Sequence, residues 1–142
     1  MTQTKATTLA CGIAMFVLAF ATPLHAQVEI GTWVRQDTAF KAGTMTMDVE
    51  ACCRGGRRLT YHILMGKTQS LITVESPFDG TEAPVLVNGK PTGETMAIKR
   101  VDAHHASTIV KMNGAPFGTS EATLSPDGKT LTVLNDFSSS TR

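Results

Sequence analysis

Apolar and polar residues alternate along most of this chain, and that spacing constrains the fold more than any other feature. Successive side chains of an extended strand point to opposite faces, so alternation is typical of a strand that is buried on one side. Between residues 44 and 51 the apolar members are Met45, Met47, Val49 and Ala51. Comparable segments predict further strands at 59–65, 71–74, 96–100, 108–112, 122–124 and 131–134.

Turn signals separate these segments. Each of them pairs a residue that tolerates positive φ with a glycine, which is the commonest tight-turn chemistry. They are Asp79-Gly80, Asn88-Gly89, Asn113-Gly114 and Asp127-Gly128. No part of residues 27–142 has helical periodicity over the length of a crossover connection. The sequence therefore predicts one all-β domain, an antiparallel meander that closes as a barrel or sandwich.

Residues 1–26 have the pattern of a cleavable signal peptide. A short segment with one charge, Lys5, precedes an entirely apolar stretch at 9–21, and Pro23 then ends it. Ala26 supplies the small residue that cleavage requires. The apolar stretch is shorter than the roughly 20 residues needed to cross a bilayer. We expect cleavage before Gln27, no membrane span in the mature chain, and a periplasmic or secreted domain at residues 27–142.

The charge balance disfavours polyanionic partners. Lys5 is the only charged residue in the expected leader, so its removal takes the basic count from 13 to 12, against 12 acidic residues. Nucleic acids and anionic membranes attract proteins with a basic surplus, and the expected mature chain has none. Arg54, Arg57 and Arg58 form the one local cluster, which we interpret as a solvated hairpin tip.

Two cysteines, Cys52 and Cys53, are adjacent in the expected mature chain. A disulfide-stapled domain has separated cysteines, so this fold is expected to depend on its apolar core. In an oxidising compartment the pair could form a disulfide between neighbours, bond to another chain, or bind a soft metal. Because adjacent strand residues face opposite sides, we expect one thiol to point inward and the other to lie at a strand end.

Other candidate chemistry is sparse. His104 and His105 lie beside Asp102, with His62 elsewhere, but no His-x-His spacing occurs, so solvated turn histidines are the favoured interpretation. No Gly-x-Ser-x-Gly motif accompanies the serines. The carboxylates lack the spacing of a glycosidase pair; they include Glu75, Glu94, Asp102 and Glu121. We therefore expect no catalytic residue, metal or cofactor.

Five methionines fall within the expected strands, at Met45, Met47, Met65, Met96 and Met112. Flexible thioethers fill irregular gaps in a core, which is the simpler interpretation, but they also line adaptable binding cavities. A small barrel can either be packed solid or hold one small ligand. The methionines leave both possibilities open.

An ordered set of motifs resembles a family of small bacterial exported proteins of uncharacterised function with a lipocalin-like fold. The set comprises Gly31-Thr32-Trp33, Phe78-Asp79-Gly80, the segment AIKRVDA at 97–103 and the segment SPDGKTLTV at 125–133. The resemblance implies that Trp33 closes one end of a barrel, and we expect it to be buried. The family continues past the last motif into a closing strand, which this chain lacks, so we expect a barrel open at its C-terminal edge. The segment around Cys52 and Cys53 also departs from the family.

These observations favour a non-enzymatic exported binding or accessory module with a lipocalin-like barrel that holds a small hydrophobic ligand. One alternative is a structural or interaction protein that pairs with a partner through an open sheet edge. The other is a thiol- or metal-dependent redox protein that uses Cys52 and Cys53. The sequence identifies neither the ligand nor a protein partner.

Overall fold

In the computed structural model the described part of the chain is all β, as the alternation predicts. The structure describes residues 2–3, 30–36 and 43–137. The strands are β1 (Thr2–Gln3), β2 (Gly31–Val34), β3 (Gly43–Cys52), β4 (Gly56–Met65), β5 (Thr68–Ser76), β6 (Asp79–Val87), β7 (Lys90–Arg100), β8 (His105–Met112), β9 (Ala115–Leu124) and β10 (Leu131–Asp136).

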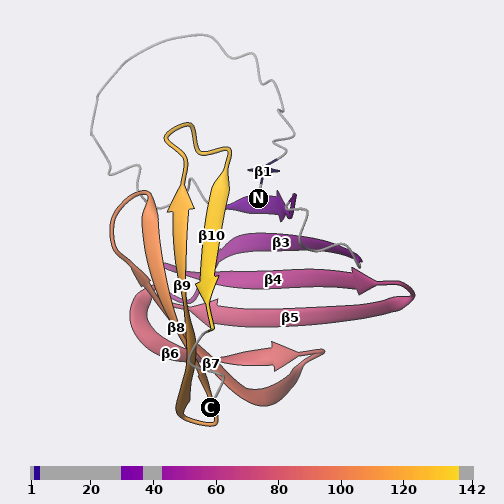
Figure 1. Ribbon diagram of the computed structural model, residues 1–142. Coiled ribbons are helices and arrows are strands. Elements are labelled where there is room, and N and C mark those ends of the chain that lie inside the picture. Colours follow the sequence, from indigo (N-terminus) through magenta and orange to yellow (C-terminus); the bar gives the residue numbers. More distant parts are fainter. Residues whose placement is uncertain (1, 4–29, 37–42, 138–142) are drawn as a thin grey trace.

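The strands form one antiparallel meander in which each strand pairs with its neighbours in the chain. Strands β3 to β5 make one wall, and β8 to β10 cross in front of them, with β6 and β7 curving between the two (Figure 1). In the described part of the chain, no strand pairing joins β10 to β1 or β2. The barrel is therefore nearly closed, with an unsealed seam beside its last strand, and the predicted open C-terminal edge is confirmed.

The core lies where the inward faces of the two walls meet. Register brings Val49, Leu59, Val74 and Val85 side by side across β3 to β6, and all four are buried. Trp33 pairs with Met47 across β2 and β3 and has no exposed surface, so its predicted burial is confirmed.

Three of the four turn signals lie in turns. Asn88 and Gly89 have φ angles of 50° and 80°, and Asn113 and Gly114 have 50° and 82°, as the tightest hairpin turns require. The turn at Asp127-Gly128 is also present. The turn expected at Asp79-Gly80 is wrong in position: both residues already belong to β6, and the reversal falls at Pro77 and Phe78, where Phe78 has a φ of 59°.

Among the long strands, β6 is the one that the alternation did not predict, and the short strands β1 and β2 were not predicted either. Its register against β7 shifts twice, between Asp79 and Glu82 and again between Pro84 and Leu86. These shifts accompany a first half of β6, Asp79–Glu82, in which every residue is exposed, so no alternation marks the beginning of the strand in the sequence. They also bend the strand, which lets β6 pair with β5 at one end and follow β7 around the curve.

Most of the expected leader lies outside the described residues, as do 37–42 and 138–142. Thr2–Gln3 pairs with β2. Among the residues described, no helix is long and apolar enough to cross a membrane.

Candidate functional site

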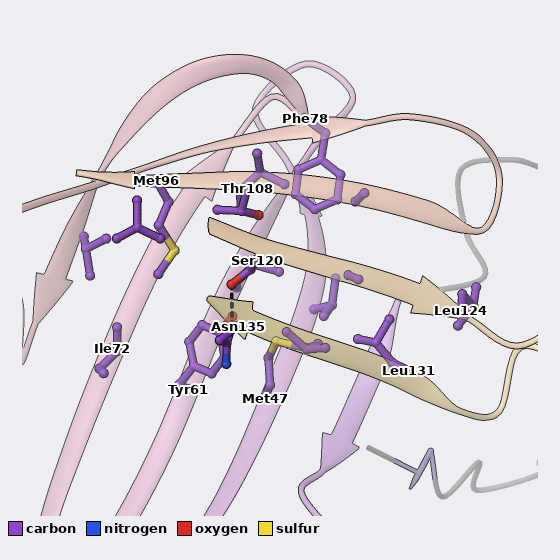
Figure 2. A pocket seen from close by; sticks show the side chains of 18 of the residues that line it. Met47, Tyr61, Ile72, Phe78, Met96, Thr108, Ser120, Leu124, Leu131 and Asn135 are labelled. Atoms are coloured by element: carbon purple, nitrogen blue, oxygen red, sulfur yellow. Dashed lines mark hydrogen bonds between the residues drawn. The ribbon is translucent and has the colours of Figure 1, made fainter. Parts of the chain in front are cut away.

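A cavity of about 450 Å³ lies inside the barrel, between the wall of β3 to β5 and the wall of β7 to β10. Its lining comes mainly from the inward-facing positions of these strands, which the alternation placed on the core side. Figure 2 shows side chains from opposite walls pointing into the same space, among them Met47, Tyr61, Ile72, Met96, Leu124 and Leu131. The interior is thus only partly filled, and most of the labelled side chains around the empty space are apolar.

Methionines from both walls line the cavity. Met45, Met47 and Met96 line the cavity, and Met47 also belongs to the buried core. Met65 instead lies at the end of β4 and is 48% exposed. Three of the five strand methionines therefore line the cavity, where thioethers can adapt to the shape of a bound molecule.

A polar row crosses the apolar lining on β8, β9 and β10. Thr108 pairs with Ser120 in the sheet, and Ser120 pairs with Asn135. The Ser120 hydroxyl donates a hydrogen bond to Asn135 Oδ1 (Figure 2). All three side chains line the cavity, so this wall offers hydroxyl and amide groups to a polar part of a ligand.

Tyr61 and Glu94 bring ionisable groups to the cavity from β4 and β7. Burial raises the pKa of Tyr61 to about 12, and the negative charge of Glu94 adds to the rise, so the phenol is neutral at physiological pH. Partial burial also raises the pKa of the Glu94 carboxyl above its usual value. Both shifts reflect an environment with little water.

His104 is exposed on the turn between β7 and β8, as predicted, whereas His105 is exposed but is already the first residue of β8. Asp102 accepts the backbone N–H of His104 at 2.8 Å and lies 2.8 Å from His105 Nδ1. These contacts hold the pKa of the Asp102 carboxyl below its usual value. His104 Nδ1 lies 3.2 Å from the carbonyl of Leu124. The two rings are thus engaged in shaping the turn at the edge of the cavity.

Cys52 and Cys53 are joined by a disulfide. The expectation that the two side chains face opposite sides is wrong, because the strand ends at Cys52 and Cys53 belongs to the turn, with a φ of 51°. Cys53 Sγ lies 3.8 Å from the Glu75 carboxylate. The disulfide is at the tip of the β3–β4 hairpin, and neither cysteine lines the cavity.

The arginine cluster is only partly a solvated tip. Arg54 is exposed, and Arg58 is a partly exposed side chain that pairs with Glu75 at 2.7 Å. Arg57 is instead 4% exposed, and its guanidinium donates to the carbonyl of Gly56 at 2.9 Å. It shares the inward phase of Leu59 on β4 and pairs with the fully buried Ser76 on β5, which explains the burial. The prediction of a solvated Arg57 is therefore wrong.

His62 lies on the outer face of β4, 3.0 Å from Asp48. Asp48 also accepts a hydrogen bond from the Thr32 hydroxyl at 2.6 Å. The Thr32 hydroxyl contacts the Asp48 carboxylate and not the His62 imidazole. An activated nucleophile needs a hydrogen bond to a general base such as imidazole, and Thr32 makes no such bond to His62. Within the described ranges, no group of three or more His, Cys, Asp or Glu side chains is placed to hold a metal ion.

Neither the family models, nor the curated proteins, nor the solved structures compared with this chain contain a match.

Proposed function

We propose that this protein is an exported, non-enzymatic binding module with a lipocalin-like barrel that holds one small apolar ligand. The observation that carries the proposal is the cavity of about 450 Å³ inside the barrel. Ligand sites are typically concave, mostly apolar spaces of about 300–1,000 Å³ with a few polar groups that orient the ligand. The leader-like pattern of residues 1–26 supports the export part of the proposal.

The unsealed seam gives this cavity a route to solvent. Two rings, Phe117 and Phe137, line the cavity near the end of β10, with their centroids 5.6 Å apart. Phe137 is 41% exposed and Val133 is 38% exposed, so apolar surface continues from the cavity toward the outside. An apolar ligand would meet favourable contacts along this path.

A titration with N-phenyl-1-naphthylamine, a neutral apolar dye, tests the proposal. We expect one dye molecule per chain, with the fluorescence rise typical of transfer out of water. Ala122 lines the cavity, so Ala122→Phe should fill it and weaken dye binding at least tenfold. Thr123 is the next residue on β9 and is exposed, so Thr123→Phe adds the same ring outside and should bind the dye like the parent. No saturable binding to the parent, or equal binding to Ala122→Phe, would contradict the proposal.

A second candidate function rests on the exposed edge at β10. Leu134 is 69% exposed on this strand, and no described strand pairs with its outer edge. Such an edge can pair with another chain, and a second copy of this protein would offer the same strand. Sedimentation analysis tests this: a concentration-dependent dimer that Leu134→Lys removes would favour an interaction protein, and a monomer at all concentrations would contradict it.

A further inference from the structure

Glu94 is the one carboxylate among the described residues that line the cavity. It lies on β7, in phase with Met96 and Ile98, whose side chains also face the cavity. An acidic group at the lining of an apolar space requires an explanation, because a charge removed from water is unfavourable unless it is paired.

No basic group neutralises Glu94 within the part of the chain that the structure describes. Two other acids on the sheet do have such partners: Glu75 pairs with Arg58, and Glu82 pairs with Lys111. Arg100 lines the cavity from the far end of β7, where its guanidinium lies 5.4 Å from the centre of the Phe78 ring. Glu94 thus leaves an uncompensated negative charge at the cavity.

Tyr61 lies near this charge. Its hydroxyl is neutral at physiological pH, and no hydrogen bond to it is formed within the described residues. A neutral phenol can donate one hydrogen bond and accept another. Its ring also offers a face that attracts a cation. Together, an unpaired carboxylate and an aromatic hydroxyl match a group that is positively charged and carries N–H donors.

We propose, resting on the proposed function, that the ligand is a cationic amphiphile, with an apolar body in the cavity and a protonated amine at Glu94 and Tyr61. The aliphatic and methionine side chains that line the cavity bury the apolar body of the ligand. The carboxylate takes the ammonium through a charge-assisted hydrogen bond, which is stronger than a neutral one. The two cavity arginines, Arg35 and Arg100, make an anionic amphiphile the competing class.

Three probes with the same chain and different head groups separate these classes: decylammonium, decanol and decanoate. Each is used to displace the neutral dye from the full mature protein at pH 7 and at concentrations below micelle formation. We expect decylammonium to bind at least about tenfold more tightly than decanol, the ratio typical of one hydrogen bond to a charged group. Decanoate should bind no better than decanol.

Glu94→Gln keeps the shape of the side chain and removes its charge. In this variant decylammonium should lose its advantage, while the affinity for decanol stays within about twofold of the parent. The matched control is Glu121→Gln, which removes the same charge from an exposed residue on β9 and should preserve the tenfold preference. Tyr61→Phe should reduce the preference severalfold without affecting decanol.

The outcomes distinguish this inference from the proposed function. Equal affinity of the three probes, or a preference that survives Glu94→Gln, would overturn the amine assignment and leave the binding module intact. Tighter binding of decanoate would overturn it in favour of recognition by arginine. If neither the dye nor any probe binds the parent, both proposals fail. A preference for decylammonium that only Glu94→Gln and Tyr61→Phe reduce would support the amine site.

Discussion

Trp33 illustrates how one side chain joins a short strand to the rest of the barrel. β2 has only four residues. The indole of its Trp33 is fully buried in a cluster that includes Met47, Val49 and Leu59. Replacing a large buried aromatic residue by alanine typically costs about 3–5 kcal/mol, a large part of the stability of a small domain.

We therefore predict that Trp33→Ala lowers the free energy of unfolding by about 3–5 kcal/mol. The measurement is urea denaturation followed by far-ultraviolet circular dichroism. An unchanged denaturation midpoint would show that Trp33 does not have the structural role assigned to it.

Glu94 predicts a pH dependence of stability. Its pKa is raised on folding, so the folded chain binds this proton more tightly than the unfolded chain. The resulting stabilisation is complete below the unperturbed glutamate pKa of about 4.3 and is lost as the pH rises through the raised pKa. At pH 7 Glu94→Gln should melt at a higher temperature than the parent, because it removes a partly desolvated charge.

The same comparison at acidic pH provides the check. Below the pKa of Glu94 the parent carries a neutral carboxyl, so the difference in melting temperature from Glu94→Gln should disappear. Glu121→Gln, on the exposed surface, should show no such pH-dependent difference. A Glu94→Gln variant that is less stable than the parent at pH 7 would assign Glu94 a structural role.

The roles of single residues could be predicted only in part. The burial of Trp33 followed from its motif, whereas the burial of Arg57 did not, because a charged residue beside a turn is usually solvated. Glu94 shares the inward phase of Met96 and Ile98, and that phase was a signal that sequence reasoning could have used. The raised pKa values of Glu94 and Tyr61 depend on the opposite wall, which local sequence does not specify.

At the scale of elements, the β3–β4 hairpin carries the disulfide between Cys52 and Cys53 at its tip. A disulfide stabilises a fold mainly by restricting the unfolded chain, and this effect shrinks as the closed loop shortens. A bond between neighbours closes almost no loop. The hairpin should therefore owe its stability to the long run of paired residues between β3 and β4 and to the core beneath it.

We predict that the double change Cys52→Ser and Cys53→Ser leaves the thermal midpoint within a few degrees of the parent, equivalent to at most about 1 kcal/mol. Differential scanning calorimetry of the oxidised parent and of the double variant provides the comparison. A loss of several kcal/mol would mean that the thiols hold the fold through another bond, and would favour the redox or metal alternative.

The last strand depends on a glycine of its neighbour. A Cβ atom built on Gly118 would overlap with the Phe137 ring and lie 2.8 Å from the backbone oxygen of Asp136. Both approaches are closer than van der Waals contact, so a side chain at position 118 must displace the end of β10. The missing side chain of Gly118 thus leaves room for the end of β10 and for Phe137.

Gly118→Ala is predicted to lower the free energy of unfolding by about 1–3 kcal/mol, the usual cost of overpacking. Backbone amides at the end of β10 should also exchange faster with deuterium. Thr119→Ala changes the next, exposed residue of β9 and should change stability by no more than about 0.5 kcal/mol. Equal exchange rates in Gly118→Ala and the parent would contradict this account of the last strand.

Elements were predictable where the alternation is regular. β3 and β4 begin and end within a few residues of the predicted segments, and the turns at Asn88 and Asn113 have the expected positive φ angles. β6 was missed because every residue of its first half is exposed, so no alternation marks its beginning. Strand lengths were underestimated in general, since hydrogen bonds to a neighbouring strand extend pairing into polar residues.

At the scale of the whole molecule, the meander follows from a chain in which tight turns separate successive strands, since each strand then pairs with the one before it. The incomplete closure follows from the absence of strand pairing between β10 and β1 or β2 in the described part of the chain. The strand methionines left a cavity open as one of two possibilities, but its volume could not be predicted, because it depends on how the two walls curve around it. Its volume is also the basis of the proposed function.

The most direct test of that function uses the methionine methyl groups as reporters. In protein labelled with ¹³C at these methyls, decanol should shift the resonances of Met45, Met47 and Met96, which line the cavity. The resonance of Met65, which is exposed outside the cavity, should stay in place. Saturable shifts of the first three alone are the predicted result. Unchanged resonances of these three methionines at saturating decanol, or a shift confined to Met65, would contradict a ligand site inside the barrel.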